Sequence, residues 1–183
     1  MLITHHDLPD EYTKRIGSGL IKWAYLETYI QNCCYLLLGV DGVVGRIAIR
    51  EPRLPDRITM LEEIGYLRGF DINEKTLAQL RKQITDANRW RDLFAHGTWT
   101  DIPERGWCVR DVRGNLPQAA GYKGHLNKRK FTPQARPVNI ELLDNFLFNV
   151  NALISSVREL QINLEGMIEA QRQQAQEQAP DSA

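Results

Sequence analysis

The sequence has little cysteine and no long hydrophobic run. Its 183 residues include three cysteines, and no spacing among them resembles a zinc site or a redox CxxC motif. The longest apolar stretch is Cys33–Val40, whereas a membrane-spanning helix needs about 20 residues. The N-terminus lacks a basic start followed by an apolar run, so we expect no signal peptide. These absences predict reduced, buried thiols, no membrane association and a cytoplasmic location.

Motifs for common cofactors are also missing. The chain contains no GxGxxG, no phosphate-binding Walker loop, no GxSxG and no HExxH. The adjacent pair His5 and His6 lies near the N-terminus, and adjacency alone is weak evidence for a metal site. We therefore expect neither a metal nor another cofactor.

Positive charge is concentrated in one segment of a chain that is neutral overall. Lys plus Arg and Asp plus Glu each total 23. Residues 105–136 nevertheless contain Asp111 as their sole acid among eight bases. Such a segment can bind a phosphate backbone, although a solvated basic loop has the same composition. The candidate RNA contacts in this segment are Arg110, Arg113, Lys128, Arg129 and Lys130.

Apolar residues recur at helical spacing in four segments, which predicts main helices over about residues 10–38, 55–68, 73–97 and 140–172. A short helical turn is expected at about 42–49. The predicted inward stripes are Trp23, Leu26, Ile30, Cys33 and Leu37; Ile58, Leu61 and Ile64; Leu77, Leu80, Ile84, Ala87, Arg91 and Phe94; and Leu143, Phe146, Val150, Leu153, Val157, Leu160, Leu164 and Met167.

Residues typical of helix ends bound these segments. Asn73 and Asn139 are favourable N-caps, each with apolar residues at hydrophobic-staple spacing. Gly39, Gly69 and Gly97 follow the last periodic residues of three helices and are suited to helix termination.

A small β element interrupts the helices. Residues 98–100 and 107–112 are rich in aromatic and β-branched residues and are joined by a turn-rich segment, which predicts a hairpin. An exposed basic loop follows, and the Gln-rich end over residues 171–183 is expected to be a disordered tail. The fold class is therefore all-α: a bundle of four main helices in one domain over residues 1–170, with the hairpin and basic loop (98–136) before the last helix.

Arg91 breaks the apolar stripe of the third main helix. Burying an unpaired guanidinium is costly, so Arg91 must be paired in the core or face a cleft or a subunit interface. His96 follows five residues later, and in an unbroken helix the two side chains would point about 140° apart. We expect the helix to end or loosen after about Leu93, which Gly97 permits, so that the guanidinium and the imidazole share one cleft.

The segment Arg91-Asp92-Leu93-Phe94-Ala95-His96-Gly97 resembles the RxxxxH motif of HEPN domains (higher eukaryotes and prokaryotes nucleotide-binding). The extended form Arg-Asn/Asp-x-x-Ala-His-Gly is matched as well, and the helical layout is similar over about residues 10–165. The resemblance implies a HEPN-like bundle that forms a homodimer, with the motif facing a cleft between the subunits. Many members are metal-independent endoribonucleases that act as toxins or in defence.

The resemblance also implies roles for individual residues. His96 would act as general acid or base, Arg91 would stabilise charge on the phosphate, Asp92 would orient one of them, and Asn88 would assist. Some toxin members have a tyrosine two residues after the histidine, where a partner nucleotidyltransferase modifies it. This chain has Thr98 there, which puts that toxin–antitoxin subtype, and with it a cognate antitoxin, in doubt.

Two other functions stay open. Arg91 paired with Glu27 or Asp92, together with His96 as a cation at a helix C-terminus, would suit a non-catalytic dimeric interaction module. The basic loop would suit an RNA-binding regulator without chemistry. Trp90, Trp99, Trp107 and Tyr122 would stack on bases in either RNA-directed function, or pack in the core.

Overall fold

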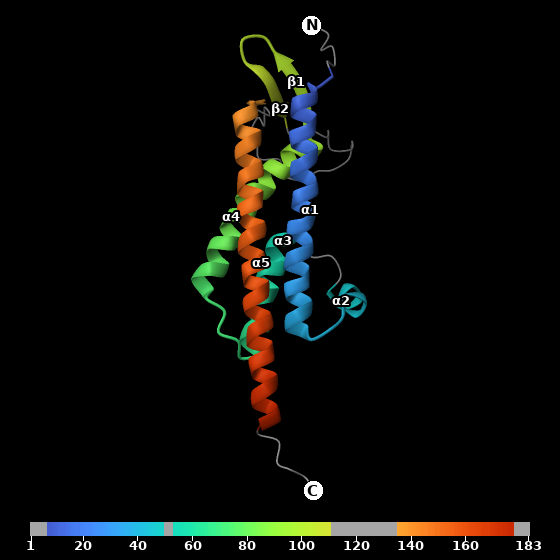
Figure 1. Ribbon diagram of the computed structural model, residues 1–183. Coiled ribbons are helices and arrows are strands. Elements are labelled where there is room, and N and C mark those ends of the chain that lie inside the picture. Colours follow the sequence, from blue (N-terminus) through green and yellow to red (C-terminus); the bar gives the residue numbers. More distant parts are fainter. Residues whose placement is uncertain (1–6, 50–52, 111–134, 178–183) are drawn as a thin grey trace, which may run out of the picture. The chain divides into compact units, whose positions relative to one another are not determined.

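The computed structural model describes residues 7–49, 53–110 and 135–177 (Figure 1). Within them the chain is predominantly helical, with a small antiparallel sheet, which confirms the all-α class. The elements, in chain order, are α1 (Asp10–Leu38), α2 (Gly42–Ile49), α3 (Leu54–Leu67), α4 (Glu74–His96), β1 (Thr98–Ile102), β2 (Gly106–Arg110), β3 (Arg136–Pro137) and α5 (Ile140–Glu177).

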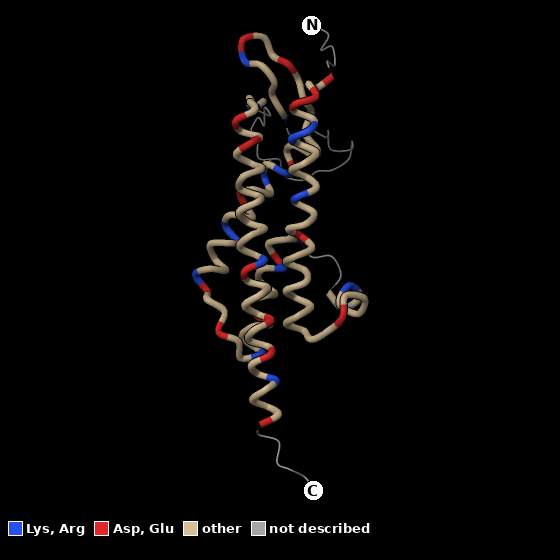
Figure 2. Tube along the Cα trace, viewed as in Figure 1, with Lys and Arg blue, Asp and Glu red and all other residues tan. Residues whose placement is uncertain are grey.

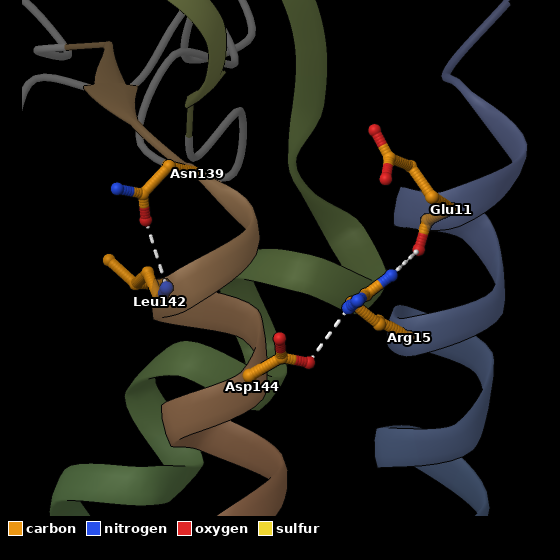
Figure 3. A network of polar contacts seen from close by, with 5 residues as sticks. All are labelled: Glu11, Arg15, Asn139, Leu142 and Asp144. Atoms are coloured by element: carbon orange, nitrogen blue, oxygen red, sulfur yellow. Dashed lines mark hydrogen bonds and ion pairs between the residues drawn. The ribbon is translucent and has the colours of Figure 1, made fainter.

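The expected caps and stops define the helix ends. The Asn73 side-chain oxygen accepts from the backbone N–H groups of Lys75 (3.0 Å) and Thr76 (3.2 Å) at the start of α4. Asn139 accepts from Leu142 N–H (2.9 Å) at the start of α5 (Figure 3). Gly39 has φ +68° directly after α1, a conformation that glycine adopts at little cost. The side chains named from the sequence therefore satisfy orphan backbone donors.

Contacts between residues divide the chain into two units. The hairpin unit combines Met1–Leu20 with Asn88–Leu147, and the helical unit combines Ile21–Ala87 with Phe148–Ala183. The single domain expected over residues 1–170 stays a prediction.

In the hairpin unit, a three-stranded sheet of order β1-β2-β3 packs beside the start of α1, the end of α4 and the start of α5. Strand β1 pairs with β2 over Thr98↔Arg110 to Ile102↔Gly106, as the predicted hairpin requires. Two residue pairs attach β3, which the sequence analysis missed. Its Pro137 is tolerated because β3 lies at the sheet edge, where one row of N–H groups has no ladder partner.

An ion pair joins the first turns of α1 and α5 in this unit. The Arg15 Nε donates to Asp144 Oδ1 at 2.7 Å, while Arg15 Nη1 donates to the Glu11 carbonyl oxygen at 3.2 Å (Figure 3). Acidic residues occupy the N-terminal turns of both helices (Figure 2). Their negative charge interacts favourably with the positive end of the helix dipole.

The core of the helical unit is built from the predicted stripes. From α1, Trp23, Leu26, Ile30, Cys33 and Leu37 are buried, and so are Ile58 and Leu61 of α3, Leu77, Leu80 and Ile84 of α4, and Val150, Leu153, Val157 and Leu164 of α5. Ile64 and Leu160 of the predicted stripes are half-buried. Met167 was assigned wrongly, because it is 37% exposed and Ile168 (9%) is buried instead. A straight helix drifts by about 20° per heptad, so a strict seven-residue repeat leaves the buried face after three heptads.

The last helix is longer than expected, because α5 continues to Glu177 and residues 171–177 are not a disordered tail. Glutamine, alanine and glutamate are good helix formers. Pairs at i,i+4 spacing add support, since Gln161 Nε2 donates to Glu165 Oε1 (2.9 Å) and Gln173 Nε2 to Glu169 Oε1 (3.4 Å). Residues 178–183 of the expected tail lie outside the described residues.

Among the described residues, no helix combines the length and apolarity that crossing a bilayer would require.

Gly97 lies against β2 in close contact. A methyl group there would collide with the Leu93 carbonyl oxygen and would lie 2.5 Å from Val109 Cγ2 and 3.2 Å from the Arg110 carbonyl oxygen. We expect Gly97→Ala to lower the free energy of unfolding by about 1–3 kcal/mol. The control is Gly17→Ala in α1, whose added methyl group meets nothing within 4 Å and should stabilise by up to about 1 kcal/mol. Urea unfolding measures both, and equal effects would contradict the contact.

The three thiols are free and buried, as expected. Burial raises the pKa of Cys33 to about 12 and that of Cys34 to about 11, so DTNB should label the native protein very slowly at pH 8 and all three thiols after denaturation. The free energy of unfolding should also fall as the pH rises above 9.0, the ordinary thiol pKa. The reason is that these thiols ionise in the unfolded chain at a lower pH than in the folded protein. Rapid labelling of the native protein would contradict this burial.

Candidate functional site

Arg91 and His96 lie in one uninterrupted stretch of α4, within the hairpin unit. The helix runs to His96, and the Gly97 N–H still donates to the Leu93 carbonyl oxygen at 2.8 Å. The loosening after Leu93 that the sequence predicted does not occur. The reason is the contact of Gly97 with β2, which allows the chain to pass directly from a complete helical turn into β1.

Asp92 pairs with the guanidinium of Arg91 and lies one helical turn before His96. The Arg91 Nη1 donates to Asp92 Oδ1 at 2.9 Å. Asp92 and His96 are four residues apart, so their side chains are neighbours on the helix surface, with Cβ atoms about 5–6 Å apart. The Arg91–Asp92 pair therefore lies about one turn before His96, although the Cα–Cβ bonds of Arg91 and His96 point about 140° apart in a regular helix.

The site is accessible to solvent. The side chains of Arg91 and Asp92 are 29% and 28% exposed, so both are half-buried. His96 is exposed and is the last residue of α4. Its imidazole is therefore open to solvent.

Two of the other residues predicted to bind RNA lie in the last turns of α4 or next to its end. Asn88 is half-buried one helical turn before Asp92 and on the same face. Arg110 is exposed at the end of β2, paired with Thr98, and its carbonyl oxygen faces Gly97. The remaining predicted contacts lie outside the described residues: Arg113, Lys128, Arg129 and Lys130, together with Tyr122.

The tryptophans near the motif belong to an aromatic cluster, which we define as Tyr12, Trp90, Phe94, Trp99, Trp107 and Phe146. Phe94 is its centre, with ring centroids 5.6 Å from Trp90, 5.9 Å from Trp99 and 5.2 Å from Phe146. Tyr12 contacts Trp99 (6.5 Å) and Trp107 (6.4 Å). Trp90, Trp99 and Trp107 are half-buried, so they pack partly against neighbouring rings, and their stacking on bases stays a prediction.

Arg136 is a residue of this region that the sequence analysis did not name as a site. It is exposed on β3, and its Cζ lies 5.9 Å from the centroid of the Trp90 ring. A two-residue strand has no periodicity to detect, so the local sequence carries no signal beyond the basic segment itself.

The described residues hold no group of three or more His, Cys, Asp or Glu side chains suited to a metal ion. A cavity of about 390 Å³ lies in the helical unit, lined by Tyr35, Glu165 and Ile168 among others. Neither Arg91 nor His96 lines it.

No protein-family model matches the chain, and comparisons with curated proteins and with solved structures find no match. The HEPN resemblance therefore stays a prediction that rests on the motif residues and the helical layout.

The exposure of the Arg91–Asp92 pair predicts a small effect on stability. A double-mutant cycle of Arg91→Ala and Asp92→Ala should give a coupling energy of about 1 kcal/mol or less, as exposed pairs do. Urea unfolding of the two single variants and the double variant measures it. A loss of about 3 kcal/mol or more for Arg91→Ala would instead indicate a buried structural pair.

Proposed function

We propose that this chain is a metal-independent endoribonuclease of the HEPN type, with Arg91 and His96 as catalytic residues and Asp92 as the positioning residue. One observation carries the proposal: Asp92 pairs with Arg91 at 2.9 Å and lies one turn from the exposed His96. In this proposal the guanidinium and the imidazole act on the same phosphodiester.

The reaction uses the 2′-hydroxyl of the RNA as the nucleophile. His96 accepts the 2′-hydroxyl proton, and the oxygen forms a bond to the adjacent phosphorus. The bond from phosphorus to the 5′-oxygen breaks, and that oxygen takes up a proton from the imidazolium or from water. The products are a 2′,3′-cyclic phosphate and a 5′-hydroxyl. Arg91 donates to the phosphoryl oxygens as negative charge builds up on them.

RNA and a second copy of the chain are the proposed partners. Arg110 adds a positive charge beside the end of α4, and Asn88 adds an amide on the face of Asp92. The homodimer, the toxin or defence role and a cytoplasmic site of action are proposed from the family resemblance. Thr98 disfavours the tyrosine-modified subtype and its antitoxin.

A non-catalytic interaction module is the second candidate. The pairing of Arg91 with Asp92 favours it, because this contact helps to satisfy an arginine on an otherwise apolar stripe. An RNA-binding regulator would use the same basic residues without cleavage.

The test is cleavage of total RNA and of a single-stranded RNA oligonucleotide by the purified chain, with EDTA present. We expect fragments ending in a 2′,3′-cyclic phosphate. His96→Ala should reduce the rate about 10²–10⁴-fold and Arg91→Ala about 10²–10³-fold, with both variants folded. The matched control is Arg89→Ala, which removes an exposed arginine from the same helix and should leave the rate unchanged.

Intact RNA with the wild-type chain would favour the interaction module. Cleavage that survives His96→Ala would assign the activity to other groups and refute the proposed roles.

A further inference from the structure

Arg136 is held over an aromatic ring at the surface of the hairpin unit. Its Cζ lies 5.9 Å from the Trp90 ring centroid, a cation–π distance, and the residue is exposed. Trp90 in turn contacts Phe94 at 5.6 Å. The guanidinium is thus the outermost member of a series that runs from a buried phenylalanine through a half-buried indole to solvent.

The sheet register explains why Arg136 reaches this place. Trp99 pairs with Val109, and Val109 pairs with Arg136, so the three side chains form a row on one face of the sheet. Trp99 stacks on Phe94, which shows that this face packs against α4. Arg136 ends the row at the sheet edge, and its long apolar stem can cross the aromatic cluster while its head group stays in water.

This arrangement adjoins the proposed catalytic residues. Trp90 immediately precedes Arg91 on α4, and Arg110 directly follows the strand partner of Arg136. Gly97, next to His96, lies against the Arg110 carbonyl oxygen. The end of α4 and the ends of β2 and β3 therefore meet at one end of the sheet.

We propose that Arg136, positioned by Trp90, is a stacking platform for one unpaired nucleobase, so that the site selects single-stranded RNA. The proposal rests on the proposed function for its ligand class. Unstacked bases in single-stranded RNA stack on aromatic rings and on guanidinium planes, whereas duplex bases are already covered by their neighbours. The contact with Trp90 restrains the guanidinium before RNA binds, and its N–H groups can donate to a base edge or a phosphate.

The test measures binding by fluorescence anisotropy in the full-length His96→Ala chain, so that cleavage does not interfere. The probes are a labelled single-stranded RNA and the same strand in a duplex. Arg136→Ala should weaken single-strand binding about tenfold to a hundredfold, the effect of losing one stacked base. Arg136→Lys should lose most of this affinity too, because lysine keeps the charge and lacks the plane.

The matched control is Arg158→Ala, which removes another exposed arginine stacked on an aromatic ring, Tyr29, at 5.7 Å in the helical unit. In the His96→Ala chain, Arg158→Ala should leave the affinity for single-stranded RNA unchanged. Thermal midpoints of all variants exclude unfolding as the cause.

Single-strand affinity that is unchanged in Arg136→Ala, or fully kept in Arg136→Lys, would overturn the platform. Equal affinity for the duplex would overturn it as well. The two proposals fail separately: cleavage by the wild-type chain with no role for Arg136 would refute the platform alone. Loss of binding in both Arg136 variants, with no cleavage by the wild-type chain, would refute the nuclease alone.

Discussion

Phe94 makes the contacts on which the candidate site depends. Its ring packs against Trp90 on its own helix, against Trp99 of β1 and against Phe146 of α5. These contacts attach the last turns of α4 to the sheet and to the start of α5. The position of the Arg91–His96 segment is thus determined by an apolar residue between them.

Close packing at the end of α4 changes how the motif residues come together. Gly97 allows the backbone to lie against Val109 and Arg110, so the helix stays regular to His96. The Cα–Cβ bonds of Arg91 and His96 therefore leave the helix about 140° apart, and Asp92 pairs with the guanidinium of Arg91. The acid after the arginine in the motif thus makes a structural contact, whether or not the site is catalytic.

Helices were the predictable part of this fold, because an amphipathic stripe and its caps are local features. The α1 and α4 stripes, the caps Asn73 and Asn139 and the hairpin all agree with the structure. The predictions were wrong where the structure depends on contacts between distant parts of the chain or on the exact geometry of a helix. Strand β3 exists because β2 offers it an edge, and the buried face of α5 moves from Met167 to Ile168 because a straight helix does not keep a seven-residue repeat.

The sequence by itself determined the helical class, the helix starts at Asn73 and Asn139 and the choice of Arg91 and His96 as candidates, since periodicity, capping and residue chemistry are readable along the chain. Tertiary structure decided how those candidates relate. The regular end of α4 against β2 and the placement of Arg136 over Trp90 both require chain segments far apart in sequence to pack together. Such packing depends on side-chain shape in three dimensions, which no local pattern encodes.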